Sequence, residues 1–115
     1  MRTAILVLGS IALLSCGLFP PAAPQNVVAS ISGTTVTVTW SAVPGAETYD
    51  VCDRMEGQVM TGGNCSELGA GEDLYATSFT YDVSSVKGVT YSYRVRASNA
   101  IGDSAWSEYS NPVSY

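Results

Sequence analysis

Three cysteines, Cys16, Cys52 and Cys65, are the side chains of this 115-residue sequence most suited to covalent chemistry. A thiol can accept a lipid, form a disulfide or bind a metal, and its sequence context indicates which. The sequence contains no histidine, so neither a Ser-His nor a Cys-His pair can form within the chain. We therefore expect no catalytic residues, no cofactor and no enzymatic activity.

Carboxylates form a second cluster of potentially reactive groups. Their oxygen atoms are the ligands that Ca²⁺ prefers, but no D-x-D-x-D-G loop is present and acidic loops are commonly just solvated. The sequence therefore predicts no metal site, with calcium binding as the alternative. The carboxylates are Asp50, Asp53, Glu56, Glu67, Glu72 and Asp73.

Cys16 ends an apolar run that extends from Ala4 to Leu14 and follows the basic residue Arg2. A membrane-spanning helix needs about 20 apolar residues, so this run is too short to span a bilayer. Its length is that of the apolar core of a signal peptide. Residues 1–15 are therefore predicted to be the signal peptide of an exported protein.

The order Leu13-Leu14-Ser15-Cys16 resembles the lipobox of bacterial lipoproteins. In that family the cysteine thiol carries diacylglycerol and the leader is removed before the cysteine. Two acyl chains give stable anchoring where one does not. The resemblance implies a membrane anchor at Cys16 in the bacterial cell envelope, and Gly17 in place of aspartate indicates the outer membrane. An ordinary cleaved signal peptide and an uncleaved leader are the alternatives.

Residues 16–24 contain three prolines and predict an extended linker between the lipid and the folded part. At polyproline spacing this linker reaches roughly 25 Å, which keeps the domain close to the membrane. The net charge of −5 disfavours binding to the phosphate backbone of nucleic acids. We expect the membrane to be contacted through the lipid anchor.

Side chains alternate between apolar and polar in the remaining part, residues 25–115, and no helical stripe is sustained. Val36, Val38 and Trp40 share one face of such a segment. Short strands at this spacing predict an all-β, seven-stranded sandwich. Six of the seven strands are assigned to residue ranges: 27–31, 34–40, 48–52, 79–83 and 91–98, and a final strand from the turn at 99–103 to the C-terminus.

Three sequence stretches resemble a fibronectin type III domain: TVTVTW, Tyr49-x-Val51, and TYSYRVRASNAIGDSAWS. The resemblance implies an immunoglobulin-like sandwich with Trp40 and Tyr49 in the core. It also implies that Tyr91 is the tyrosine-corner residue, whose hydroxyl bonds the backbone upstream. The usual Leu-x-Pro before this tyrosine is replaced by Val86-Lys87-Gly88, which leaves the shape of the corner open.

If Cys16 carries lipid, Cys52 and Cys65 remain as a pair in an exported protein. A disulfide between them is expected, because exported proteins retain disulfides. Cys52 follows Val51, so its side chain is expected to face out of the core. Free thiols that bind metal or act in redox chemistry are the alternative.

The stretch Trp106-Ser107-Glu108-Tyr109-Ser110 partly resembles the W-S-x-W-S motif of cytokine-receptor fibronectin domains. In that family, arginines of the preceding strand stack on the aromatic rings, and Arg94 and Arg96 are suited to this role. The alternative is that Trp106 forms an exposed platform for a sugar or a partner. The turn before it is expected to be tight, with Gly102 at positive φ.

The glycine-rich excursion from Arg54 to Leu74 is longer than the fold requires, so we expect it to contact a partner. Its candidate contact residues are Gly57, Gln58 and Asn64. The sequence thus predicts a non-catalytic lipoprotein that acts as an interaction or structural component of the envelope. The partner is an unknown envelope protein or polysaccharide. A carbohydrate-binding or adhesive module and a passive spacer are the alternatives.

Overall fold

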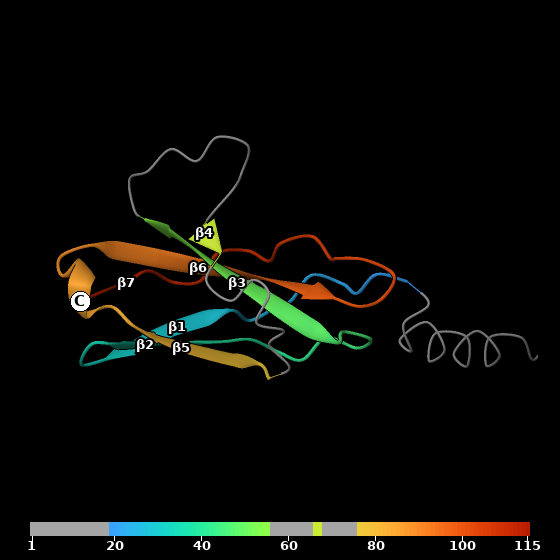
Figure 1. The fold of residues 1–115 in the computed structure, drawn as a ribbon, viewed down its shortest axis with the longest axis horizontal. Coiled ribbons are helices and arrows are strands. Elements are labelled where there is room, and N and C mark those ends of the chain that lie inside the picture. The colour runs from blue at the N-terminus through green and yellow to red at the C-terminus, as the bar shows by residue number, and fades with distance from the viewer. Residues whose placement is uncertain (1–18, 56–65, 68–75) are drawn as a thin grey trace, which may run out of the picture.

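A computed structural model describes residues 19–55, 66–67 and 76–115 of the chain. They form two antiparallel sheets that pack face to face (Figure 1). One sheet has the order β1-β2-β5, with bounds Val28–Ser32, Thr35–Thr39 and Ser78–Asp82. The other has the order β4-β3-β6-β7, with bounds Ser66–Glu67, Thr48–Met55, Thr90–Ser98 and Val113–Ser114.

The core lies between the sheets and is built by the alternation of side chains along the strands. Val36 and Val38 of β2 are fully buried against residues of β3 and β6. Trp40 and Tyr49 meet in this core with ring centroids 5.3 Å apart in an edge-to-face arrangement. The all-β fold and the core positions of these two aromatic residues are therefore confirmed.

The expected final strand is wrong in its extent. β7 spans only Val113–Ser114, and β4 is equally short. Residues 104–110 lie beside β6 without forming a regular ladder with it. Seven regular strands are therefore not confirmed, because the segment after the β6 turn has a different backbone geometry, described below.

The tyrosine corner expected at Tyr91 is not formed within the described part of the chain, where the Tyr91 hydroxyl makes no hydrogen bond. The connection into β6 passes through a short 3₁₀ turn, Ser84–Val86, and through Gly88 in the left-handed conformation. The Gly88 N–H donates to the Tyr115 carbonyl at 2.8 Å. Tyr91 packs at the margin of the core, and the fully buried tyrosine of β6 is Tyr93.

The first described residues lie on the domain rather than away from it. Pro21 and Pro24 are buried, and the Phe19 carbonyl accepts a hydrogen bond from Asn99 Nδ2 at 2.8 Å. The Ser41 N–H donates to the Gln25 carbonyl at 3.0 Å. The described part of the 16–24 linker is therefore docked, and its free reach is much shorter than the extended estimate.

Asn111 ties the segment before β7 to β1 on the opposite sheet. Its Oδ1 accepts from the Ala29 N–H at 3.0 Å, and its Nδ2 donates to the Ala29 carbonyl at 2.9 Å. The side-chain amide thus supplies both groups that a neighbouring strand would offer. It closes part of the β1 edge against pairing with another chain.

Asn111→Ala is expected to lower the free energy of unfolding by about 1–2 kcal/mol, because the buried Ala29 loses two hydrogen-bond partners. Asn111→Asp keeps the acceptor for the Ala29 N–H but sets a carboxylate oxygen against the Ala29 carbonyl, so it should also be destabilised at neutral pH. Urea unfolding of both variants at constant m-value measures the difference. Equal stabilities of Asn111→Ala and the wild type would contradict this role.

A polar network crosses the sandwich at one edge of the core. The Tyr81 and Tyr93 hydroxyls lie 2.9 Å apart, and the Tyr81 hydroxyl donates to Asp53 Oδ2 at 3.5 Å. Burial raises the pKa of the Asp53 carboxyl above its usual value of 3.8. Burial also raises the pKa of both tyrosine hydroxyls, so they stay protonated and donate hydrogen bonds at neutral pH.

The raised pKa of Asp53 means that the folded protein binds this proton more tightly than the unfolded chain. The resulting stabilisation is fully present below pH 3.8 and is lost as the pH rises through the folded-state pKa. Asp53→Asn should therefore gain stability relative to the wild type as the pH rises to neutral, by less than about 1 kcal/mol because Asp53 is half exposed. Urea unfolding midpoints of the wild type and Asp53→Asn, measured at acid and at neutral pH, test this. A difference in stability between the two proteins that does not change with pH would contradict it.

Candidate functional site

Three arginines lie on the outer face of the four-stranded sheet, away from the core. Arg94 and Arg96 alternate with the buried Val95 along β6. The register pairs Arg96 with Asp50 and Arg94 with Cys52 on β3. Arg54, two residues beyond Cys52 on the same face, is the diagonal neighbour of Arg94.

Residues 104–110 run beside β6 with a repeat of three residues. The N–H groups of Ser104, Ser107 and Ser110 donate to the carbonyls of Ala97, Val95 and Tyr93 at 2.7, 2.9 and 2.6 Å. Each serine Oγ accepts from the N–H of the same β6 residue, at 2.9, 2.9 and 3.0 Å. Each Oγ also donates to the carbonyl of the following residue.

This pairing matches three residues of the 104–110 segment to every two residues of β6. Two strand residues span about 6.8 Å, so the segment advances only about 2.3 Å per residue, where an extended strand advances about 3.4 Å. The segment is therefore wound rather than extended. Serine hydroxyls replace the carbonyl acceptors that a regular strand would offer to β6.

The same three-residue repeat brings Trp106 and Tyr109 over the outer face of the sheet. The Tyr109 ring centroid lies 3.8 Å from Cζ of Arg54 and 5.0 Å from that of Arg94. The Trp106 ring centroid lies 5.1 Å from Cζ of Arg94 and 4.6 Å from that of Arg96. Cations and rings thus alternate in one array, Arg54–Tyr109–Arg94–Trp106–Arg96, which we term the arginine–aromatic ladder.

The spacing of the ladder follows from strand geometry. Arg94 and Arg96 are two residues apart on one face, a separation of about 6.8 Å. This is close to twice the 3.5 Å contact distance of non-bonded carbon atoms, so one flat ring fits between two guanidinium groups. The ring offsets part of the repulsion between the two positive charges through its negative face.

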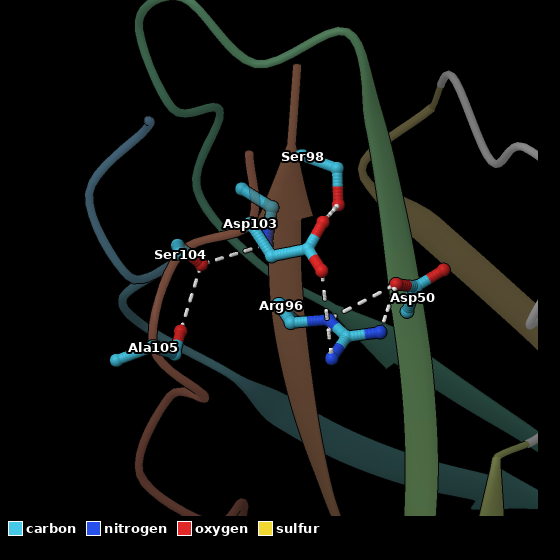
Figure 2. A network of polar contacts seen from close by, with 7 residues as sticks. Asp50, Arg96, Ser98, Asp103, Ser104 and Ala105 are labelled. Carbon is cyan, nitrogen blue, oxygen red and sulfur yellow. Dashed lines mark hydrogen bonds and ion pairs between the residues drawn. The ribbon is translucent and has the colours of Figure 1, made fainter. Parts of the chain in front are cut away.

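Two carboxylates hold Arg96 at one end of the ladder (Figure 2). Arg96 Nη2 and Nε donate to Asp50 Oδ2 at 2.7 and 3.1 Å. Asp103 Oδ2 lies 3.8 Å from Arg96 Nη1, and its Oδ1 accepts from the Ser98 hydroxyl at 2.7 Å. The guanidinium is thus fixed in position and charge-compensated, which makes it a structural group rather than a mobile binding group.

The described residues form open grooves on the surface. One groove, with a volume of about 370 Å³, lies between residues 24–27 and 107–109 beside the ladder. Asp50 and Asp53 face opposite sides of their sheet, so they cannot share a cation. Within residues 19–55, 66–67 and 76–115, no group of three potential metal ligands comes together, and no helix is long and apolar enough to cross a membrane.

The structure brings Trp106, Arg94 and Arg96 together in the stacking that the sequence predicted. Cys52 is on the outer face as expected, but it is fully buried rather than exposed. The expected positive φ of Gly102 is wrong, because Asn99 Oδ1 closes the turn by accepting from the N–H groups of Ile101 and Gly102. Five predicted residues lie outside the described part of the chain: Cys16, Gly57, Gln58, Asn64 and Cys65.

Sequence reasoning missed the three serines, Arg54 and Asn99. The serines repeat at intervals of three within a segment that alternation had assigned to a strand, and this interval was the available signal. Arg54 joins the ladder through the register of β3 with β6, which a single sequence does not reveal.

Comparison with known proteins gives structural neighbours alone: no protein-family model and no curated protein matches the sequence. An Fn3-like protein from Clostridium thermocellum has 28% identity and a TM-score of 0.61, and the match covers 78% of this chain and 88% of that chain. Titin kinase with its flanking domains has 27% identity and a TM-score of 0.65, with 83% of this chain covered. The chain spans only 17% of the length of that titin chain.

A third neighbour, a variant of FN3tt, has 18% identity and a TM-score of 0.63, with 82% and 94% of the two chains covered. At this identity the likeness concerns the fold alone. The two antiparallel sheets, the core that they enclose and these neighbours together show that the chain has a fibronectin type III fold.

Proposed function

We propose that this protein is a non-catalytic bacterial lipoprotein that presents one fibronectin type III domain at the outer membrane. It acts there as a protein-interaction or structural component of the cell envelope. The fibronectin type III fold supports a module of this kind. The absence of histidine from the sequence supports a role without nucleophile–histidine catalysis.

The observation that carries the proposal is the position of Cys16 relative to the folded domain. An apolar leader ends in Leu13-Leu14-Ser15-Cys16, and Phe19, three residues later, is already docked on the domain through its hydrogen bond with Asn99. A lipid on Cys16 would therefore hold the domain directly at the bilayer surface.

The test is expression of the full chain in a bacterium with two membranes, beside a Cys16→Ser variant. We expect the mature wild-type protein to begin at a diacylglyceryl cysteine by mass spectrometry and to fractionate with the outer membrane. Cys16→Ser should lose the lipid mass. A wild-type protein recovered without lipid from the soluble periplasmic fraction would overturn the proposal.

The proposal includes a disulfide between Cys52 and Cys65, and Cys65 lies outside the described residues. It is supported by β4, in which Ser66 pairs with Asp53 and Glu67 pairs with Cys52. Ser66, the residue that follows Cys65 in the sequence, thus lies opposite Asp53, the residue that follows Cys52. Peptide mapping without reduction should yield the linked fragments, and alkylation of both thiols without prior reduction would refute the pairing.

A carbohydrate-binding or adhesive module is the alternative, with Trp106 as the platform. Sugars stack on exposed rings, whereas the Trp106 ring is half-buried with Arg94 and Arg96 near its centroid. Iodide should therefore quench Trp106 fluorescence weakly against the constant signal of the buried Trp40. Strong quenching, with binding to insoluble polysaccharide that is lost in Trp106→Ala, would favour the alternative.

A further inference from the structure

Asn99 joins three separate segments at the end of the sandwich where Phe19, the first described residue, lies. Its Nδ2 donates to the carbonyls of Phe19 and Gly45 at 2.8 and 3.1 Å. Its Oδ1 accepts from the N–H groups of Ile101 and Gly102 at 2.9 and 3.2 Å. Both donors and both lone pairs of the amide are thus used, and the three segments are fixed to one another.

The side chains at this end form an uncharged surface, which we term the apolar apex. Phe19 and Ile101 are its largest members, and each is 55% exposed. The side chain of Pro20 packs 3.7 Å from the position that a Cβ on Gly102 would take, which places Phe19 beside the turn. The apolar apex consists of Phe19, Pro20, Pro44, Ala100 and Ile101, all exposed.

Two acidic residues, Glu47 and Asp103, lie behind the apolar apex beside Ser98. Glu47 is exposed and its N–H donates to the Ser98 carbonyl, and Asp103 bonds the Ser98 hydroxyl. The surface is therefore not suited to an anionic partner. Its chemistry fits an apolar or zwitterionic surface.

The length of chain between the lipid and Phe19 limits where the apolar apex can lie. Three Cα–Cα steps separate Cys16 from Phe19, a distance of at most about 11 Å. The headgroup layer on each side of the hydrocarbon is itself roughly 5–8 Å thick. A lipid on Cys16 therefore leaves the apolar apex within or directly above the headgroups.

We propose that the apolar apex docks into the headgroup region of the membrane that carries Cys16, with Phe19 and Ile101 inserted among the lipids. This inference rests on the proposed lipid anchor. Two exposed side chains bind membranes weakly by themselves, but a short tether raises their effective concentration to the millimolar range. The C-terminus lies at the opposite end of the sandwich (Figure 1), so the docked domain would stand upright with this end away from the membrane.

The test uses the full lipidated protein in zwitterionic phosphatidylcholine vesicles with brominated acyl chains, which quench nearby indoles. An Ile101→Trp variant should lose about half of its added emission, because an inserted side chain lies 5–10 Å into the headgroup–acyl boundary. Tyr115→Trp, at a 40% exposed site at the far end, is the matched control and should show no added quenching. The wild-type protein gives the background from Trp40 and Trp106.

A second substitution separates insertion from mere proximity. Phe19→Ser in the Ile101→Trp background should remove most of the quenching, whereas Val28→Ser, at a 51% exposed position on β1, should not. Equal quenching at positions 101 and 115 would overturn the upright orientation. An unquenched Ile101→Trp on a protein whose lipid is shown by mass would overturn the inference alone, and an unlipidated Cys16 would overturn both proposals.

Discussion

Replacing Ser104, Ser107 and Ser110 together by alanine is expected to lower the free energy of unfolding by roughly 3–6 kcal/mol. Each hydroxyl is the acceptor for one N–H group of β6, on Ala97, Val95 or Tyr93. These three β6 residues are fully buried, so water cannot take the place of the serine. An unsatisfied buried N–H costs about 1–3 kcal/mol, and the three losses concern separate amides.

A loss of this size is a large fraction of the 5–15 kcal/mol that stabilises a typical small domain. The single variant Ser107→Ala should lose about 1–2 kcal/mol and should speed hydrogen exchange at the Val95 amide. Ser85→Ala, on the exposed 3₁₀ turn, is the matched control and should be neutral. Calorimetry that shows the triple variant as stable as Ser85→Ala would mean that the wound segment does not depend on its hydroxyls.

Residues 104–110, which contain these serines, are the segment whose backbone structure was predicted wrongly from the sequence. Alternation identified Val36, Val38 and Trp40 as one buried face, because a strand repeats every two residues and the core selects apolar side chains. The same rule placed Arg94 and Arg96 outward and therefore predicted stacking. It could not describe residues 104–110, because a segment that pairs three residues with two does not follow a period of two.

Other features depended on contacts between distant parts of the chain. Asn99 binds the carbonyl of Phe19, 80 residues away in sequence, and Asn111 binds the backbone of Ala29, 82 residues away. Nothing local to either asparagine specifies such a partner. The docking of Phe19 could not be predicted for the same reason, since the prolines of residues 16–24 suggested a free linker.

Trp106→Ala is expected to lower the free energy of unfolding by about 2–3 kcal/mol. Only the triple serine variant is expected to lose more. The half-buried ring loses apolar contact, and two cation–π contacts with Arg94 and Arg96 are lost with it. Without the ring, the two guanidinium groups also lose the negative face that offsets their mutual repulsion. Trp106→Phe keeps a flat ring and should cost less than about 1 kcal/mol.

A double-mutant cycle separates the ladder contacts from simple burial of the indole. Arg96→Lys keeps the charge beside Asp50 but removes the planar group that stacks on Trp106. Arg96→Lys also loses the paired hydrogen bonds to Asp50, and this cost is common to both backgrounds. If stacking holds the ladder, Arg96→Lys should cost more in the wild type than in Trp106→Ala, by a coupling energy of about 0.5–1.5 kcal/mol. Additive costs would show that the ring stabilises the outer face by covering it, and that Arg96 contributes through Asp50 and Asp103 rather than through stacking.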